Sequence, residues 1–337
     1  MKVIAIGDPH FKTSNILDVE KFIDRIQELA SNEQPDIIVI LGDLLHEHER
    51  LHTTPLNKAY EFVRKMSEIS KTYVIVGNHD LINNQQFLTQ NHWMNAMKDW
   101  DNVTVIDDVL VEHNFLFCPY VPNGRFMDAI SKYENWKECQ AIFCHQEFKD
   151  CKMGAIISEH GDEWDESYPP VIAGHIHSNQ TIKNVYYPGS SMQHAFGESD
   201  KNVIPLITFN DDDRNYELNE IDLDLPRKHI IYKEVSDVDN IKIPENDDQY
   251  KLTLSGNSEE FKTFKKSNKY KELTKKGIKV VYKPKKKDNQ TLSDIPDDIN
   301  FSEILHKLIL NEKNGELLTL FNHVVYDKDI NEDMIVI

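Results

Sequence analysis

Seven side chains able to bind metal ions follow short apolar runs in the first 180 residues of the sequence. They are carboxylates, imidazoles and one amide, and a glycine directly precedes four of them. Such a ligand set, without any thiolate, suits Mn²⁺, Fe or Zn²⁺ in a reactive site better than a structural zinc site. The candidate ligands are Asp8, His10, Asp43, Asn78, His145, His175 and His177.

Seven ligands are too many for one ion, but two ions that share Asp43 divide them evenly. The two sets are then Asp8, His10 and His177 on one ion, and Asn78, His145 and His175 on the other. Each ion keeps room for a water molecule or a phosphate oxygen. Two metal ions about 3.5–4 Å apart generate hydroxide and stabilise both oxygens of an in-line phosphoryl displacement. The pattern therefore predicts metal-dependent hydrolysis of a phosphoester.

Predicted strands must bring these ligands together. Apolar runs at residues 3–6, 37–41 and 73–76 alternate with helical patterns at about 16–30 and 55–70, which is typical of βαβ units with a parallel sheet. Further strands are predicted at 103–106, 115–117, 141–144, 171–173, 184–187 and 203–209. Their closer spacing predicts an α/β fold with two stacked sheets flanked by helices. Because loops at the carboxyl ends of parallel strands meet in one crevice, we expect the ligands to converge there.

The ordered motifs resemble those of the calcineurin-like metallophosphoesterase superfamily, which implies an αββα sandwich with a di-metal centre. The sequence Gly42-Asp43-Leu44-Leu45-His46 resembles the GDLFH element of double-strand-break repair nucleases of the SbcD or "Mre-eleven" type. Residues 187–190 and 196–198 resemble their YPGS…FGE element, although residues 191–195 lack an Arg-like residue expected there. The motif match covers about residues 1–200, and the compact, Asn-, Asp-, Lys- and Ile-rich chain is similar to phage- or virus-encoded versions.

This resemblance implies metal binding by all seven candidate ligands and two further roles. His79 would protonate or stabilise the leaving oxygen, and His46 would orient the scissile phosphate, as an imidazole near neutral pH can do. A solvated loop position is the alternative for His46, because His48 and His52 lie close by. His194 has no ligand-like neighbours in the sequence, and an ordinary structural role is expected for it.

Composition divides the chain into three predicted parts. An acidic stretch at residues 211–225 ends a phosphoesterase domain over 1–225. Residues 226–288 are predicted to form a small βαβ domain, with strands at 250–254 and 278–282 and a helix between Asn257 and Gly277. Residues 289–337 are predicted to form a polar linker and a helical hairpin. The apolar stripe of this hairpin consists of Phe301, Ile304, Leu305 and Leu308.

The formal charge of −19 argues at first against a nucleic-acid partner, but the charge is unevenly distributed. Residues 262–287 contain twelve lysines and one acid, a local charge of +11 that leaves −30 on the rest. Lysine without arginine suits sequence-independent contact with phosphates, and a solvated charged face is the alternative. One helical face is predicted to carry Lys262, Lys265, Lys266 and Lys269. Beyond Ser267-Asn268 the pattern slips, because Leu273 falls on the lysine side, and a kink is predicted there.

The resemblance also implies partners. In that family a small domain at this position caps the active site and contacts DNA, and a C-terminal helical pair binds the coiled-coil base of an SMC-like ABC ATPase. The stripe at residues 301–308 fits this use, and packing onto its own domain is the alternative. Such nucleases also form homodimers through the phosphoesterase domain.

We therefore predict a two-metal DNA nuclease that trims duplex ends and nicks single strands in DNA end processing, repair or recombination. Its ions are predicted to be Mn²⁺, with Mg²⁺, Fe or Zn²⁺ as alternatives. Two other functions remain open. One is a phosphoesterase for a small phosphomonoester or cyclic nucleotide, and the other is a non-catalytic subunit that tethers DNA ends. Four cysteines without a CxxC pair, apolar runs of at most five residues and a start unlike a signal peptide predict a protein of a reducing intracellular compartment, without a membrane segment.

Overall fold

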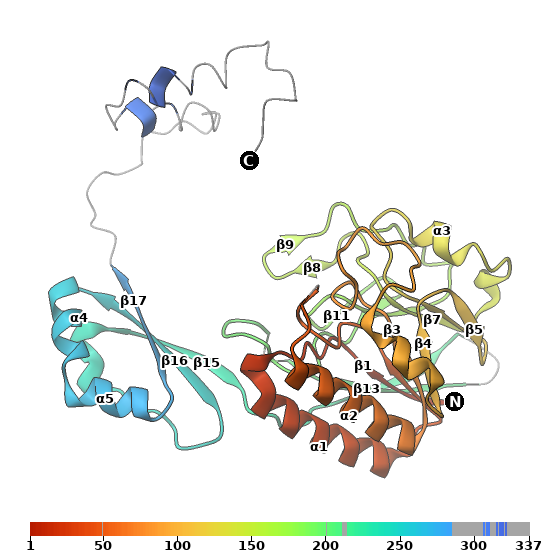
Figure 1. The fold of residues 1–337 in the computed structure, drawn as a ribbon, viewed down its shortest axis with the longest axis horizontal. Coiled ribbons are helices and arrows are strands. Elements are labelled where there is room, and N and C mark those ends of the chain that lie inside the picture. Colours follow the sequence, from red (N-terminus) through yellow and green to blue (C-terminus); the bar gives the residue numbers. More distant parts are fainter. Residues whose placement is uncertain are drawn as a thin grey trace. The chain divides into compact units, whose positions relative to one another are not determined.

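The computed structural model describes residues 1–48, 50–199, 201–210 and 214–284, and beyond them residues 306, 308–310, 315, 317–319 and 321. The chain divides into two compact units, Met1–Lys283 and Pro284–Ile337. The first unit contains two large sheets and a separate three-stranded sheet (Figure 1).

Two six-stranded sheets form the centre of the first unit. Each has four parallel strands, extended by antiparallel strands at one edge of the first sheet and at both edges of the second. The first sheet has the order β14 (Tyr216–Ile221), β13 (Ile204–Phe209), β1 (Lys2–Ile6), β2 (Ile37–Ile40), β3 (Lys71–Ile75), β4 (Val103–Ile106). The second has the order β11 (Gln180–Ile182), β12 (Val185–Tyr187), β10 (Val171–Gly174), β7 (Ala141–His145), β6 (Phe115–Cys118), β5 (Leu110–Glu112).

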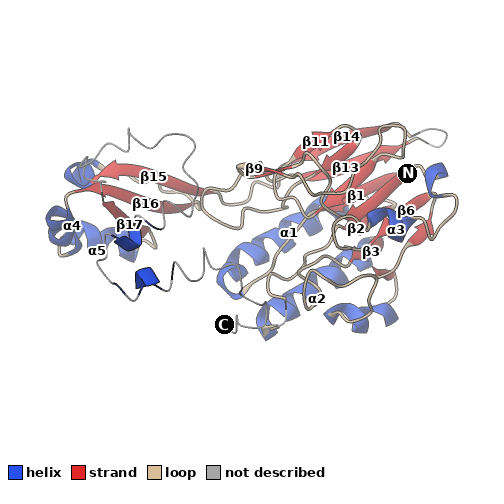
Figure 2. Ribbon diagram, turned by 90° about the horizontal axis from the view of Figure 1, so that it is seen from above, coloured by secondary structure: helices blue, strands red, loops and turns tan. Residues whose placement is uncertain are grey.

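The parallel strands are buried on both faces, which is why they read as continuous apolar runs. An apolar layer between the sheets joins Tyr73 of β3 to Phe117 of β6, whose rings stack with centroids 4.4 Å apart. Helices α1 (Ile16–Glu33) and α2 (Thr53–Ile69) lie side by side over the outer face of the first sheet (Figure 2).

A second apolar cluster covers the outer face of the other sheet. It includes residues of α3 (Phe126–Ile130) and of the short 3₁₀ helix η3 (Trp136–Glu138). Two further 3₁₀ helices, η1 (Thr13–Asn15) and η2 (Trp93–Asp99), and a small hairpin of β8 (Lys152–Met153) and β9 (Ile156–Ile157) lie in the connections. This layered arrangement confirms the predicted αββα fold class.

The third sheet has the order β15 (Lys228–Glu234), β16 (Gln249–Gly256), β17 (Lys279–Pro284). The 3₁₀ helix η4 (Val235–Asn240) lies between β15 and β16, and two α-helices lie between β16 and β17. Where the sequence predicts one helix with a kink beyond Ser267-Asn268, the structure has two separate helices, α4 (Ser258–Lys265) and α5 (Asn268–Lys275). The Ser267 hydroxyl accepts a hydrogen bond from the Tyr270 N–H at 3.1 Å and begins the second helix. Lys262 and Lys265 therefore lie on α4 and Lys269 on α5, not on one continuous helical face.

The predicted domain boundary after residue 225 stays a prediction, since the structure separates the chain only at Lys283. The predicted boundary after residue 288 lies outside the described residues, as do Phe301, Ile304 and Leu305. Leu308 is helical and 57% exposed. In the second unit the rings of His306 and Phe321 stack with centroids 5.4 Å apart.

We expect the aromatic layer between the sheets to dominate the stability of the first unit. Phe117 is fully buried and packs against aromatic rings of both sheets. Phe117→Ala should lower the free energy of unfolding by about 3–5 kcal/mol, because it deletes a buried ring and leaves a cavity. Leu17→Ala is the control, since Leu17 is 76% exposed and its loss should change stability by less than about 0.5 kcal/mol. Urea unfolding measures both, and equal effects would contradict the expectation.

Candidate metal centre

The candidate ligands follow the carboxyl ends of five parallel strands from both large sheets. Asp8 and His10 follow β1, Asp43 follows β2, and Asn78 follows β3 in the first sheet. His145 ends β7, and His175 and His177 follow β10 in the second sheet, where Gly174 pairs with His145. The structure thus brings together the ends of two sheets, as the strand-end pattern predicts.

Tight backbone turns aim several of these side chains. Four of the candidate ligands have a left-handed backbone conformation, although none of them is glycine. Their φ angles are 42° at Asp8, 45° at His10, 51° at Asp43 and 84° at His175. Each such conformation costs of order 1–3 kcal/mol and persists only where the surroundings enforce it. Gly77 leaves room for Asp43, because a Cβ at that position would lie 2.3 Å from Asp43 Oδ1.

One group of donor atoms is formed by Asp8, His10 and His177, which lie within 4.8 Å of one another. The Nε2 atoms of His10 and His177 are 3.0 Å apart, and His10 Nε2 is 3.4 Å from Asp43 Oδ2. Ligands bound to one ion by bonds of about 2.1 Å lie about 3.0–3.4 Å apart when the bonds meet at ordinary coordination angles. These spacings fit ligation of a common ion.

A second group lies on the other side of Asp43. Asn78 Oδ1 is 2.9 Å from both His145 Nε2 and His175 Nδ1, and those two nitrogens are 3.2 Å apart. His145 Nε2 is also 3.4 Å from Asp43 Oδ2. The same carboxylate oxygen therefore lies between both groups, as the division of the seven ligands into two sets requires.

The charges of these buried groups favour a cation. Asp8 is fully buried, its Oδ2 has no hydrogen-bond partner among the described residues, and burial raises its pKa to about 6. Burial alone would lower the pKa of His145, but the charges of Asp43 and Asp8 raise it to about 9. Although burial acts in the opposite direction, the charge of His145 holds the pKa of Asp43 well below its usual value.

The remaining imidazoles are suited to be neutral ligands. Burial lowers the pKa of His10 well below its ordinary value and that of His175 to about 3, so both present a free lone pair at neutral pH. Two carboxylates, an amide oxygen and four imidazoles match the donors preferred by divalent transition metals. The residues present thus fit a divalent metal site.

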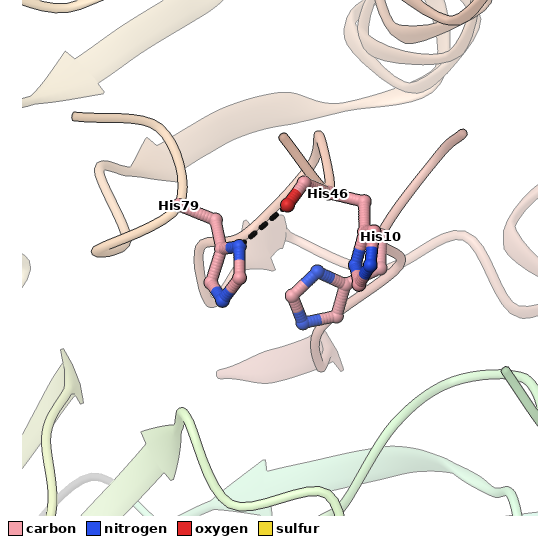
Figure 3. Close-up of side chains that lie close together, drawn as sticks. All are labelled: His10, His46 and His79. Atoms are coloured by element: carbon pink, nitrogen blue, oxygen red, sulfur yellow. Dashed lines mark hydrogen bonds between the residues drawn. The ribbon is translucent and has the colours of Figure 1, made fainter. Parts of the chain in front are cut away.

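His79 and His46 lie beside this cluster, as Figure 3 shows for His10, His46 and His79. His79 Nδ1 is 2.6 Å from the His46 carbonyl oxygen, so Nδ1 carries a proton and Nε2 is left for another partner. The His79 backbone N–H donates to Asp43 Oδ1 at 2.9 Å. The His46 ring stacks against that of His79 with centroids 5.6 Å apart, so His46 is part of the cluster and not a separate loop histidine.

Sequence reasoning missed several residues of this region. His194 is 7% exposed, its Nε2 lies 2.8 Å from the Asp8 carbonyl oxygen, and its ring centroid is 5.1 Å from that of His10. Burial lowers the pKa of His194 to about 3. Asp80 is also buried and accepts hydrogen bonds from the Gly77 N–H and the Trp93 indole at 3.0 Å each. Asp80 could have been identified from the sequence, because it belongs to the motif Gly77-Asn78-His79-Asp80. No nearby residue in the sequence distinguishes His194 from other histidines.

Comparisons with known proteins give a consistent assignment. Residues 1–179 match the model of the calcineurin-like phosphoesterase family. The chain is 48% identical over 280 residues to "Putative phosphoesterase 244L" of Invertebrate iridescent virus 6, which covers 79% of this chain and 98% of that protein. It is 41% identical over 333 residues to "Putative phosphoesterase 078R" of Invertebrate iridescent virus 3, with 95% of each chain covered.

Two solved structures are more distantly similar. The Pseudomonas putida nuclease MPE is 16% identical with a TM-score of 0.31, and the match covers 61% of this chain and 83% of that one. The phosphoesterase YfcE of E. coli is 13% identical with a TM-score of 0.31, covering 66% of this chain and all of the other. Scores this low do not inform function. Among the described residues, no helix is long and apolar enough to cross a membrane.

A divalent cation should stabilise the folded protein. At a concentration a hundredfold above its dissociation constant, an ion adds about 2.7 kcal/mol to the free energy of unfolding. Calorimetry with Mn²⁺ or EDTA should therefore show a higher Tm with Mn²⁺. Asp8→Asn should lose most of this increase in Tm. Without metal, its Tm should equal or exceed that of the wild type. The amide oxygen can still accept from the His175 N–H, and the buried carboxylate oxygen of Asp8 that has no hydrogen-bond partner in the described part of the chain is removed.

The control for this measurement is Asp128→Asn, an exposed exchange on α3 that should leave the Mn²⁺ response intact. A wild-type Tm that is the same in Mn²⁺ and in EDTA would contradict the assignment of a metal centre.

Proposed function

The chain belongs to the calcineurin-like phosphoesterase family, and we propose that it is a two-metal nuclease that hydrolyses phosphodiesters of DNA. The observation that carries the proposal is the position of Asp43. Its Oδ2 lies 3.4 Å from His10 Nε2 and 3.4 Å from His145 Nε2, between two separate groups of ligands. A shared carboxylate is what a pair of ions about 3.5–4 Å apart requires.

The proposed chemistry divides between the ions and the side chains. Two divalent ions, for which we propose Mn²⁺, would supply a hydroxide nucleophile and offset the charge that develops on the phosphate. His79 is held by two hydrogen bonds, from its Nδ1 to the His46 carbonyl and from its backbone N–H to Asp43. With Nδ1 bound to the carbonyl, Nε2 is left for the substrate, and in the protonated, imidazolium form of the ring it would donate its proton to the leaving oxygen. His46, next to both His10 and His79, would orient the scissile phosphate.

DNA is proposed as the substrate because of the GDLLH and YPGS…FGE elements and the lysine-rich region. The predicted lysines differ in whether an acidic side chain already pairs with them. Lys262 pairs with Glu259 at 2.7 Å and Lys269 with Glu272 at 3.8 Å. Within the described part of the chain, Lys265 and Lys266 form no ion pair, and both are exposed. Of the four lysines predicted to contact DNA, these two are therefore the strongest candidates for contact with phosphates.

We also propose an SMC-like ABC ATPase as partner, bound by the stripe at residues 301–308, and a homodimer formed through the phosphoesterase domain. The exposed side chain of Leu308 supports the first of these proposals. The alternatives make different demands on the chain. A phosphoesterase for small substrates would retain its activity with Lys265→Gln/Lys266→Gln, and a tethering subunit would function fully with Asp8→Asn.

The nuclease proposal is tested by a gel assay of linear duplex and single-stranded DNA with Mn²⁺ or EDTA. Wild-type protein should degrade both DNAs only with Mn²⁺, and His79→Gln should lower the rate by about 10²- to 10⁴-fold through loss of a proton donor. His113→Gln, at a histidine paired with Glu112, serves as the control and should leave the rate unchanged. If the protein hydrolyses bis-p-nitrophenyl phosphate but leaves both DNAs intact, the nuclease proposal is wrong and a phosphoesterase for small substrates takes its place.

The lysine contacts are tested by the salt dependence of DNA binding. The double exchange Lys265→Gln/Lys266→Gln should reduce the slope of log K against log salt by up to about 2, since each phosphate contact contributes about 0.9. The charge-matched control is Lys132→Gln/Lys137→Gln, at two exposed lysines of the phosphoesterase domain. Equal slopes for wild type and the Lys265/Lys266 variant would exclude these two lysines from the DNA interface.

A further inference from the structure

Residues 190–194 run beside the two chain segments that carry Asp8, His10 and His177. The Ser190 N–H donates to the His177 carbonyl at 3.1 Å, and the Ser191 N–H donates to the Gly7 carbonyl at 2.8 Å. His194 Nε2 lies 2.8 Å from the Asp8 carbonyl oxygen. One short segment thus contacts the backbone at both sides of the first ligand group.

His194 acts on a backbone turn that needs support. Because a carbonyl oxygen can only accept, His194 carries its proton on Nε2 and donates it to the Asp8 carbonyl. Its other nitrogen, Nδ1, is buried and has no hydrogen-bond partner among the described residues. The turn that follows holds Asp8 and His10 in left-handed conformations, which persist only when neighbouring groups enforce them.

The preceding residue, Gln193, contacts the third sheet. Its Oε1 accepts from the Lys228 N–H at 2.6 Å, and its Nε2 donates to the Lys228 carbonyl at 3.4 Å and to the Glu198 carbonyl at 3.2 Å. Lys228 begins β15. The side chain of Gln193 therefore bonds both backbone groups of Lys228, as a neighbouring strand would.

Lys228 completes a buried polar junction. Its ammonium group donates to the Gln193 carbonyl and to Asp18 Oδ2 of α1, at 2.8 Å each, and its side chain is 8% exposed. Gln193 is 6% exposed. A network of buried hydrogen bonds whose members are all paired is rigid, because breaking one bond leaves a desolvated polar group. The start of β15 is thus fixed to the segment that supports Asp8.

We propose that Gln193 and His194 are positioning residues that connect the third sheet to one half of the metal centre. In this view, which rests on the proposed two-ion function, Lys228 and Gln193 hold residues 190–194 in place, and His194 fixes the Asp8 carbonyl and the turn to His10. The ion bound by Asp8, His10 and His177 then depends on His194, whereas the ion bound by Asn78, His145 and His175 does not.

Titration of the full-length metal-free protein with Mn²⁺, by calorimetry, tests this dependence. Loss of a residue that supports a metal ligand typically weakens binding by about 10–100-fold. His194→Leu should weaken one of the two ions to this extent and leave the other unchanged. His194→Gln should restore wild-type affinity, because a Gln amide nitrogen reaches the position of Nε2, and His194→Asn should not, because its amide is shorter.

Two further variants complete the design. Gln193→Leu should weaken the same ion as His194→Leu, since it removes both side-chain hydrogen bonds between this segment and the backbone of Lys228. His229→Leu is the matched control, because His229 also bonds one acceptor, Asp248 at 3.1 Å, but lies on β15 away from the ligands. It should bind both ions with wild-type affinity.

The outcomes separate this inference from the proposed function. Wild-type protein that binds fewer than two Mn²⁺ ions would refute the two-ion function itself. Two ions in wild type and equally tight binding in His194→Leu and His194→Asn would leave the function intact and refute the role of His194. If His194→Leu does not fold, the comparison of His194→Gln with His194→Asn decides, because both replace the ring with an amide and differ only in its reach.

Discussion

Burial of two carboxylates between the ends of two sheets is the constraint on which the rest of this site depends. Asp8 and Asp43 are almost completely removed from water, and a buried charge is tolerated only when it is paired. His145 offsets part of this charge, but Asp8 Oδ2 stays without a partner among the described residues. Cations bound by the ligand groups would neutralise the charge of these carboxylates. The positions of the carboxylates depend on the strand ends, on the left-handed turns and on the room that Gly77 leaves for Asp43.

The buried strands of the two large sheets could be predicted from the sequence. Strands such as β2 are buried on both faces and read as apolar runs, and the polar residues after them are the seven candidate ligands that the structure brings close together. The sequence did not indicate β14 or β15, because their side chains are half-buried or exposed and mostly polar. Such strands form because they pair with a neighbouring strand, and their own sequence has no apolar pattern that predicts them.

Long-range contacts explain what was missed at the site. His194 lies 186 residues from the carbonyl that it contacts, and nothing near it in the sequence resembles a ligand motif. The pattern of the lysine-rich helix slips beyond Ser267-Asn268, which indicated a kink, but the sequence did not show that the chain divides there into two helices, α4 and α5, with Ser267 capping the second.

The left-handed backbone at Asp8 and Asp43 limits how this centre can change during evolution. Among residues other than glycine, Asn and Asp adopt this conformation most readily, since their short side chains can bond the local backbone. An exchange of Asp for Asn alters the charge of the centre by one unit without rebuilding the turn, whereas Glu, despite its equal charge, would strain the turn. Divergent members that keep these turns are therefore free to vary their preference among metal ions mainly through Asp and Asn, in steps that leave the two sheets undisturbed.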